Sequence, residues 1–308
     1  MVSLHPPSGK TNAISNTDFP YFQCASVLGT LTVLLSFTAV YLPASTSLFT
    51  TLPPQQTSLD KPQHPLLIPI TASPAWTLLW LCAGTAVCQG WWGGWMRAWW
   101  ASYPRLGFVG RVKEMDEEAK IMKRQRESGR KFADLRNACA NTLLVSVLYH
   151  LFITAMGAPI LSHLPQTYLL SLFLSLLTVF VPSYTLSLPI VTATFFRSKG
   201  PIHFHWLAAM RLFGQRRMET AMERALVYPV IATLVGSWVG AFPIALDWDR
   251  PWQAWPLTPA YGALAGYLIG SWSSFSVNTL LFFASHDLSQ EAAVTQTATS
   301  VMRSKKLL

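Results

Sequence analysis

The sequence predicts an all-α polytopic integral membrane protein with about six transmembrane helices. Charged residues make up only 12% of the 308 residues and hydrophobic ones 51%, whereas soluble domains usually carry about 25% charged residues. Long uncharged runs recur at least six times in the chain. Each is long enough to cross a bilayer as a helix, which takes about 20 residues. Because the runs are continuously apolar, a β-barrel with alternating strands is disfavoured.

Six runs are expected to be the membrane-crossing helices of a single multi-span domain covering residues 1–308. They must be helical, because lipid offers no partners for free backbone N–H and C=O groups. In chain order they are residues 19–42, 75–96, 138–160, 168–196, 226–246 and 257–283.

Basic residues gather in alternate connections between these runs. Residues 97–137 hold eleven Lys or Arg and residues 197–225 hold six, while residues 247–256 hold only Arg250. Lys and Arg are retained on the cytoplasmic side of a membrane. We therefore expect both termini and a basic loop at 97–137 to be cytosolic, and loop 247–256 to be luminal. Within the basic loop, residues 111–136 mix both signs of charge and are expected to form a solvated helix. Since topology accounts for the net charge of +9, a nucleic-acid partner is not expected.

The predicted spans are nearly free of ionisable groups. His150 is the one titratable side chain of this kind, accompanied by Asn141 and Asn278. An ionisable residue inside a membrane by default marks a transport or proton path. Its scarcity here argues against an ion-coupled carrier.

Small residues recur every four positions in the last two predicted spans. This spacing stacks them along one helical face, where backbones can approach closely. The pattern predicts helix packing, and it leaves open whether the ridges meet each other or a partner protein. The residues are Ala232, Gly236 and Gly240 in the fifth span, and Gly262, Gly266 and Gly270 in the sixth.

The connection between these two spans, Asp247–Pro256, is unusual because three charges, three tryptophans and two prolines crowd into it. Trp248, Trp252 and Trp255 would share one face of a short helix. Pro251 suits a first helical turn, and Asp247 or Asp249 could cap it. The spacing predicts a helix of one to two turns at the membrane surface, with its tryptophans at headgroup level.

Asp247 and Asp249 could together hold a divalent metal, but a metal site usually needs more ligands. The other ionisable residues expected on this side are Asp60, Lys61, His64 and His163. The chain shows no Ser-His-Asp spacing and no Gly-rich phosphate loop. The sequence therefore predicts no catalytic residues, no metal and no cofactor.

The stretch GSWVGAFPIALDWDRPWQAWPLTPAYGALAGYLIG, residues 236–270, resembles the signature of the Pig-F family. The resemblance implies a multi-span protein of the endoplasmic reticulum that works in glycosylphosphatidylinositol (GPI) anchor assembly. It implies a non-catalytic subunit that binds and stabilises large catalytic subunits. Those partners transfer ethanolamine phosphate from phosphatidylethanolamine to mannose of the anchor precursor. The family-motif positions, with a structural or partner-contact role, are Asp247, Trp248, Asp249, Arg250, Pro251, Trp252, Gln253 and Trp255.

Two other functions stay open. The chain could be an integral-membrane lipid phosphotransferase using Asp247 and Asp249, or a lipid transporter with a polar groove between helices. The tail ends in SKKLL, and Lys305 and Lys306 resemble the dilysine signal that returns cytosol-facing tails to the endoplasmic reticulum. Membrane lipids are expected partners under every reading.

Overall fold

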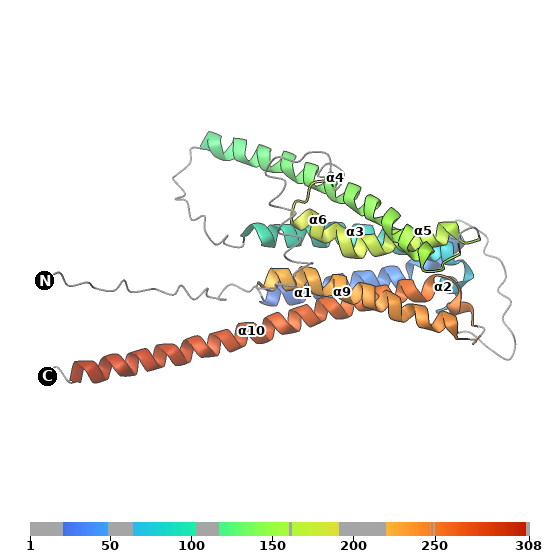
Figure 1. Ribbon diagram of the computed structural model, residues 1–308. Helices are drawn as coiled ribbons and strands as arrows, with labels where there is room; N and C mark the ends of the chain where they lie inside the picture. Colours follow the sequence, from blue (N-terminus) through green and yellow to red (C-terminus); the bar gives the residue numbers. More distant parts are fainter. Residues whose placement is uncertain are drawn as a thin grey trace.

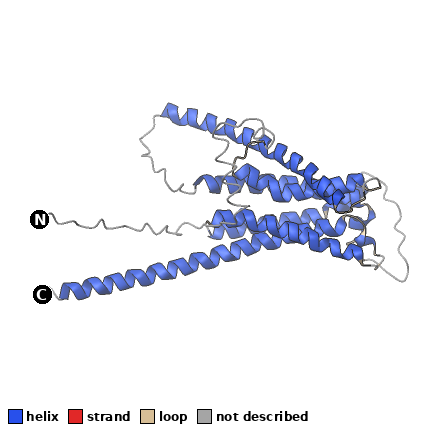
Figure 2. Cartoon of the chain, in the orientation of Figure 1, coloured by secondary structure: helices blue, strands red, loops and turns tan. Residues whose placement is uncertain are grey.

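The computed structural model describes residues 21–48, 64–102, 117–159, 162–190, 220–246, 248 and 250–305. Within these ranges the chain is helical and contains no β-strand (Figures 1 and 2). The long helices lie along one common direction, and consecutive ones run in opposite directions (Figure 1). This arrangement agrees with the all-α fold that the apolar runs predict.

Six long helices and several short pieces make up the bundle. The long helices are α1 (Tyr21–Val40), α3 (Pro74–Ser102), α4 (Glu117–Ala155), α5 (Leu164–Ser175), α9 (Ala221–Ala241) and α10 (Leu257–Lys305). The short pieces are η1 (Leu42–Leu48), α2 (Ile68–Ala72), a π-helical turn η2 (Leu176–Phe180), α6 (Val181–Thr185), η4 (Phe242–Ala245) and η5 (Pro251–Gln253).

Among the described residues, four helical stretches are long and apolar enough to cross a membrane: Tyr21–Val40, Arg130–Ala155, Leu164–Thr185 and Ala221–Ala245. They overlap the first, third, fourth and fifth expected spans. The second and sixth expected spans are also helical, within α3 and α10, but are not among these four. The tryptophans and glycines of α3 and the serines of α10 lower the mean hydropathy of these two helices.

The expected cytosolic loop 97–137 is helical over its described residues, as expected for residues 117–136, but these helices are continuous with the adjoining spans. Helix α3 continues to Ser102 and α4 already begins at Glu117; residues 103–116 lie outside the described ranges. Residues 117–137 are rich in Glu, Lys, Arg and Ala, which are strong helix formers, so the helix of the third span extends into this polar sequence.

The end of α4 is set by a glycine. Gly157 has φ +103°, a left-handed conformation that costs glycine little. The N–H of Ala158 donates to the carbonyl of Ile153 at 3.2 Å, and that of Gly157 to Thr154 at 3.0 Å. This is the Schellman pattern of a helix C-terminus. The third span therefore stops at Ala155 and not at residue 160.

The fourth span starts at Leu164, is widened in its middle and ends at Thr185. Pro182 has no N–H and its ring crowds the carbonyl four residues earlier. The π-helical turn η2 directly precedes it and accommodates the extra width. Ser187, with φ +52°, then turns the chain away. Residues 191–196 of the expected span lie outside the described part of the chain.

Helix α10 ties the bundle together through hydrogen bonds to α1 and α3. The Tyr267 hydroxyl donates to the Gln89 side-chain oxygen at 3.1 Å, in a fully buried position. The Tyr261 hydroxyl donates to the backbone carbonyl of Ala39 at 2.6 Å, and the Trp272 indole to the Thr32 hydroxyl at 3.0 Å. These aromatic donors thus hold α10 against α1 and α3 through neutral hydrogen bonds, while the part-buried Arg224 of α9 donates to the Asn278 side-chain oxygen of α10 at 2.6 Å.

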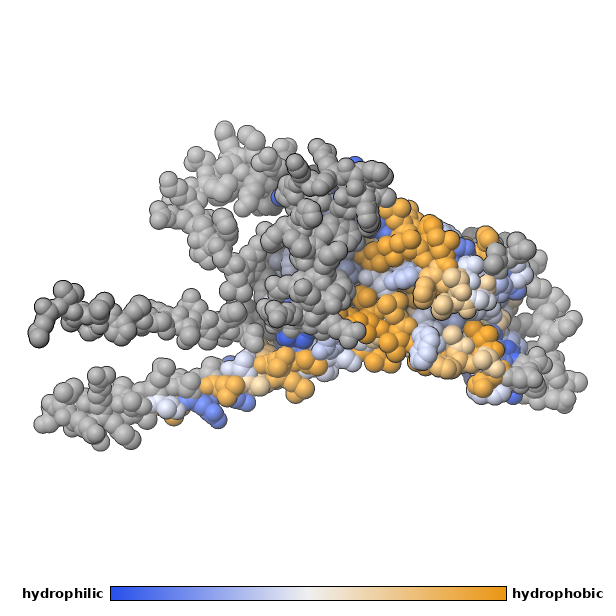
Figure 3. All heavy atoms as spheres, viewed as in Figure 1, coloured by the Kyte–Doolittle hydropathy of each residue, from blue (hydrophilic) through white to orange (hydrophobic). Residues whose placement is uncertain are grey.

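The two ends of the bundle differ. One end, here the loop end, carries η1, α2, the α4–α5 turn and loop 247–256 (Figure 1). The expected loop 43–74 thus contains two short helices, η1 and α2. Helix α10 leaves the opposite end and projects well beyond its neighbours (Figure 1). Apolar side chains cover the middle of the face seen in Figure 3, while hydrophilic ones show at the loop end.

Candidate functional site

The small-residue ridges of α9 and α10 face each other. Every glycine of the pattern lies where an added Cβ would fall closer than 3.0 Å to a backbone carbonyl oxygen of the opposite helix. Gly236 and Gly262 oppose each other, Gly266 opposes Ala232, and the other pairs are Gly240 with Thr258 and Gly270 with Tyr228. The two backbones are therefore in direct contact along five positions, which only glycine permits. This seam holds both ends of loop 247–256.

Gln253 closes the loop on itself. Its side-chain amide nitrogen donates to the backbone carbonyls of Pro243 and Leu246, both at 2.6 Å. Its side-chain oxygen accepts the backbone N–H of Arg250 at 2.9 Å. One side chain thus satisfies two carbonyls at the end of η4 and a donor at the start of η5. The same two carbonyls also accept backbone N–H groups, Pro243 from Leu246 at 3.2 Å and Leu246 from Trp248 at 2.9 Å, so Gln253 adds a second hydrogen bond to each.

The three tryptophans do not share one face, contrary to the prediction. Only Pro251–Gln253 forms a helical turn, and Ala254 already has an extended ψ of 128°. Trp255 therefore turns inward, and its indole donates to the Thr167 hydroxyl on α5 at 3.0 Å. Trp248 and Trp252 remain together edge to face, with ring centroids 5.6 Å apart. Trp248 is 49% exposed, so the outer pair alone is placed for headgroup level.

Arg250 is the only charged member of the motif whose position the structure describes, because Asp247 and Asp249 lie outside the described residues. Within the described part of the chain, the Arg250 guanidinium makes no hydrogen bond or ion pair. Its backbone N–H donates to the Gln253 side-chain oxygen, and its carbonyl accepts the Gln253 N–H at 3.0 Å. Pro251 occupies the first turn of η5, as the sequence predicts.

An apolar groove of about 320 Å³ lies between α2, Trp252 of the loop and the start of α10. Leu67, Ile70 and Thr71 line it from α2, opposite Trp252, Thr258 and Tyr261. Two of the three hydroxyls in this lining are used elsewhere: that of Thr71 donates to the Leu67 carbonyl at 2.9 Å, and that of Tyr261 to Ala39. The Thr258 hydroxyl is buried without a partner among the described residues.

The described residues do not assemble a metal centre, since no three His, Cys, Asp or Glu side chains among them come together. His64 accepts the backbone N–H of Leu66 at 3.2 Å, and His163 pairs with Ser162 at 2.8 Å. Asp60 and Lys61 lie outside the described ranges. The described part of the loop end therefore offers apolar surface, backbone groups and one free guanidinium.

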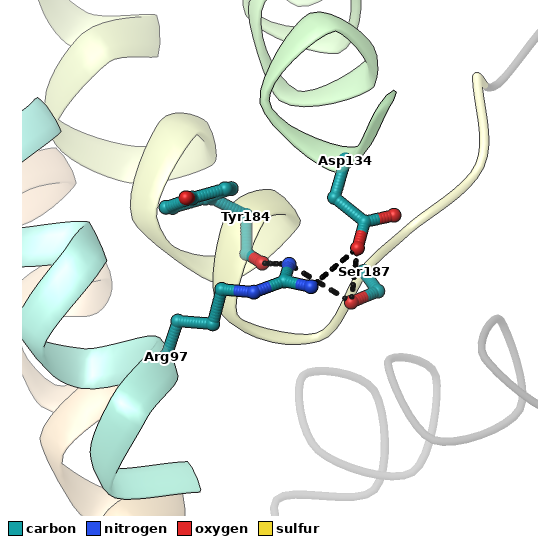
Figure 4. A network of polar contacts seen from close by, with 4 residues as sticks. All are labelled: Arg97, Asp134, Tyr184 and Ser187. Carbon is teal, nitrogen blue, oxygen red and sulfur yellow. Dashed lines mark hydrogen bonds and ion pairs between the residues drawn. The ribbon is translucent and has the colours of Figure 1, made fainter. Parts of the chain in front are cut away.

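A polar network at the opposite end escaped the sequence analysis (Figure 4). The Arg97 guanidinium on α3 pairs with the Asp134 carboxylate on α4 at 2.5 Å. It also donates to the Tyr184 carbonyl at 3.0 Å and the Ser187 hydroxyl at 3.1 Å, and it lies 5.1 Å from the centre of the Tyr184 ring. The Ser187 hydroxyl donates to Asp134 at 3.1 Å. The network joins α3, α4 and α6 where their spans end.

The expected retrieval signal lies at the far end of α10. Lys305 is the last residue of that helix, and Lys306 lies outside the described residues. Nothing in the described chain packs beside this segment in Figure 1, where α10 stands apart from the bundle.

Comparison with known proteins gives one family match. The sequence profile described as "GPI biosynthesis protein family Pig-F" matches residues 63–275. No solved structure matches the chain.

Several named proteins are similar to part of the chain. The mouse and human "GPI ethanolamine phosphate transferase, stabilizing subunit" are 34% and 33% identical over 132 residues, which cover 43% of this chain and 53% of each relative. "Glycosylphosphatidylinositol anchor biosynthesis protein 11" of Pyricularia oryzae is 37% identical over 131 residues, 42% of each chain. The chain spans about half the length of these relatives.

Proposed function

We propose, from the premise that this chain belongs to the Pig-F family of GPI biosynthesis proteins, that it is a non-catalytic membrane subunit. It binds and stabilises the large catalytic subunits that transfer ethanolamine phosphate from phosphatidylethanolamine to mannose of GPI-anchor precursors. The mouse and human relatives carry the name of stabilizing subunits of such a transferase, and this similarity is the observation that carries the proposal.

The construction of the loop end supports a structural role. The polar groups of the Gln253 side chain bond to the loop backbone, and the Trp255 indole bonds to Thr167. These two side chains therefore hold the loop in shape. Apolar side chains beside them are left outward, among them Phe242 and Trp248, which are 54% and 49% exposed. Tryptophan and phenylalanine are enriched where proteins dock. The loop and its motif residues are therefore proposed as a preformed contact for the catalytic partner.

The proposed topology has six crossings, with loop 247–256 in the lumen of the endoplasmic reticulum and both termini in the cytosol. Helices α3 and α10 join the four apolar helices because they run beside them with alternating direction (Figure 1). Lys305 and Lys306 then stand in the cytosol, where a dilysine signal is read.

We expect a protease site inserted in loop 247–256 to be protected in sealed microsomes, and one added after residue 308 to be cut. The membrane shields only the luminal side. The measurement is immunoblotting of the fragments with and without detergent, and detergent must expose the loop site. Cleavage of the loop site in intact vesicles would refute this orientation.

We expect affinity purification of the tagged chain in mild detergent to recover a much larger membrane protein, and Gln253→Glu to lower that recovery several-fold. The substituted carboxylate would face the Pro243 and Leu246 carbonyls that the amide nitrogen now contacts, so acceptors would oppose acceptors and the loop would open. The readout is the partner-to-bait ratio by mass spectrometry. Normalising to the amount of folded bait separates docking from expression.

Asp249→Asn is the control that distinguishes the rival functions. An accessory subunit bearing this change should either keep its partner and normal transfer or lose both together. If transfer stops while the complex remains at normal abundance, Asp249 acts in chemistry and the chain is a phosphotransferase. If the purified chain runs alone and its loss leaves transferase levels unchanged, the subunit proposal is wrong.

A further inference from the structure

We propose that the groove between α2 and loop 247–256 binds one membrane glycerophospholipid, with an acyl chain in the groove and the phosphate at Arg250. The groove was not part of the sequence-based site, and the inference does not depend on the catalytic partner. It rests on the proposed placement of the loop end at a membrane surface.

The size and lining of the groove suit a hydrocarbon chain. It holds about 320 Å³ and its walls are almost entirely apolar. An apolar cavity of about 150 Å³ is enough to bind benzene, so this groove accommodates a stretch of acyl chain. The Thr71 and Tyr261 hydroxyls, which could have made it polar, donate to backbone carbonyls instead. Water molecules in the groove would find few hydrogen-bond partners on this lining.

Two hydrogen-bond donors, one in the lining and one close to it in sequence, suit the polar part of the same molecule. Arg250 lies next to Pro251 and two residues before Trp252, which lines the groove. Its guanidinium is unpaired among the described residues and is the form of donor that matches phosphate best. The Thr258 hydroxyl, buried in the lining without a described partner, is a donor for an ester carbonyl of the lipid.

The tryptophans beside the groove indicate how deep it lies in the proposed membrane. Trp248 and Trp252 pack edge to face beside the groove, and paired indoles are typical of the boundary between headgroups and acyl chains. A glycerophospholipid changes from phosphate to hydrocarbon at this same boundary. Residues 247–250 include two acids beside the one arginine, so they carry no net positive charge. We therefore commit to a zwitterionic phospholipid and not to an anionic one.

The test uses the full chain reconstituted in phosphatidylcholine vesicles with a trace of phosphatidylcholine carrying a photoreactive diazirine in its acyl chain. Peptides are then mapped by mass spectrometry. We expect labelling to concentrate on residues 64–72 and 252–261. Leu67→Trp, which fills the groove from its α2 wall, should lower that labelling at least about threefold, because the apolar burial that holds the chain is lost.

Leu66→Trp is the matched control. It is the same substitution one residue away, at a side chain that is 55% exposed and does not line the groove, and it should leave labelling unchanged. Arg250→Gln should lower labelling about threefold through loss of a charge-assisted phosphate contact. Excess soluble glycerophosphocholine should not compete, since it has no chain to bury.

Equal labelling of the Leu67→Trp and Leu66→Trp variants would overturn the proposal, as would full labelling of Arg250→Gln or competition by glycerophosphocholine. Label spread evenly over the outward faces of α4 and α9 would do the same. Partner recovery measured on the Leu67→Trp variant separates this result from the proposed function. That recovery is expected to be normal when the groove is filled, because Leu67 is not among the loop residues proposed as the partner contact.

Discussion

Gly266→Ala is expected to destabilise the protein by about 2–3 kcal/mol, which is the usual cost of forcing added atoms into a packed interface. The new Cβ would meet the Ala232 carbonyl oxygen, an atom of the α9 backbone. A flexible side chain could move aside, but a helix backbone cannot, so α9 and α10 must separate along the whole seam. Gly266→Leu should cost more for the same reason.

Thermal unfolding in detergent can be followed with a thiol-reactive dye, because Cys24, Cys82 and Cys88 are buried and free. Gly90→Ala on α3 is the matched control, since its added Cβ would have no atom within 4 Å. Replacing glycine by alanine at such a helical site should be neutral or stabilising by up to about 1 kcal/mol. If the Gly266→Ala and Gly90→Ala variants melt at the same temperature, the seam does not hold these helices.

Arg97→Met is expected to cost about 3–5 kcal/mol, the typical effect of removing one partner from a buried ion pair. The Arg97 and Asp134 side chains are only 17% and 12% exposed. The substitution leaves the Asp134 carboxylate with the Ser187 hydroxyl alone and strips the Tyr184 carbonyl of its donor. Unfolding should therefore begin where α3, α4 and α6 meet, and the melting temperature should fall.

Two variants control for this result. Arg130→Met makes the same replacement on α4 at an exposed position four residues before Asp134, and it should change stability by less than about 0.5 kcal/mol. The double variant Arg97→Met with Asp134→Leu removes both charges and should recover most of the loss. A double variant no more stable than Arg97→Met would show that packing and not the uncompensated carboxylate causes the effect.

The helical fold and close packing at the glycines could be reached from sequence because each depends on a local pattern, although the pattern left open whether the two ridges meet each other. Apolar runs mark spans, and a four-residue glycine repeat marks one helical face. The extent of α4 could not, since hydropathy does not register where a helix continues into polar sequence. The seven tryptophans of α3 lower its mean hydropathy, so hydropathy alone does not identify this helix as a span.

The details of the loop depend on partners distant in the chain. Gln253 bonds to the backbone carbonyls of residues 243 and 246. Because every residue has a carbonyl, the pattern of residue types does not predict which ones are bonded. Trp255 binds Thr167, 88 residues away. The helical spacing of the three tryptophans predicted a common face, but the chain leaves helical geometry at Ala254. The pairing of Arg97 with Asp134 could not be predicted from the charged segment 97–137, because it depends on how two helices lie side by side.

The angle at which α9 and α10 cross at the glycine seam also determines where the projecting end of α10 lies. The helix has 49 residues, which at about 1.5 Å per residue is a rod of roughly 70 Å. No proline or glycine interrupts it after Gly270, so it has no built-in hinge. A small change in the crossing angle of α9 and α10 at the five glycines would therefore move Lys305, at the far end of α10, by a much larger distance.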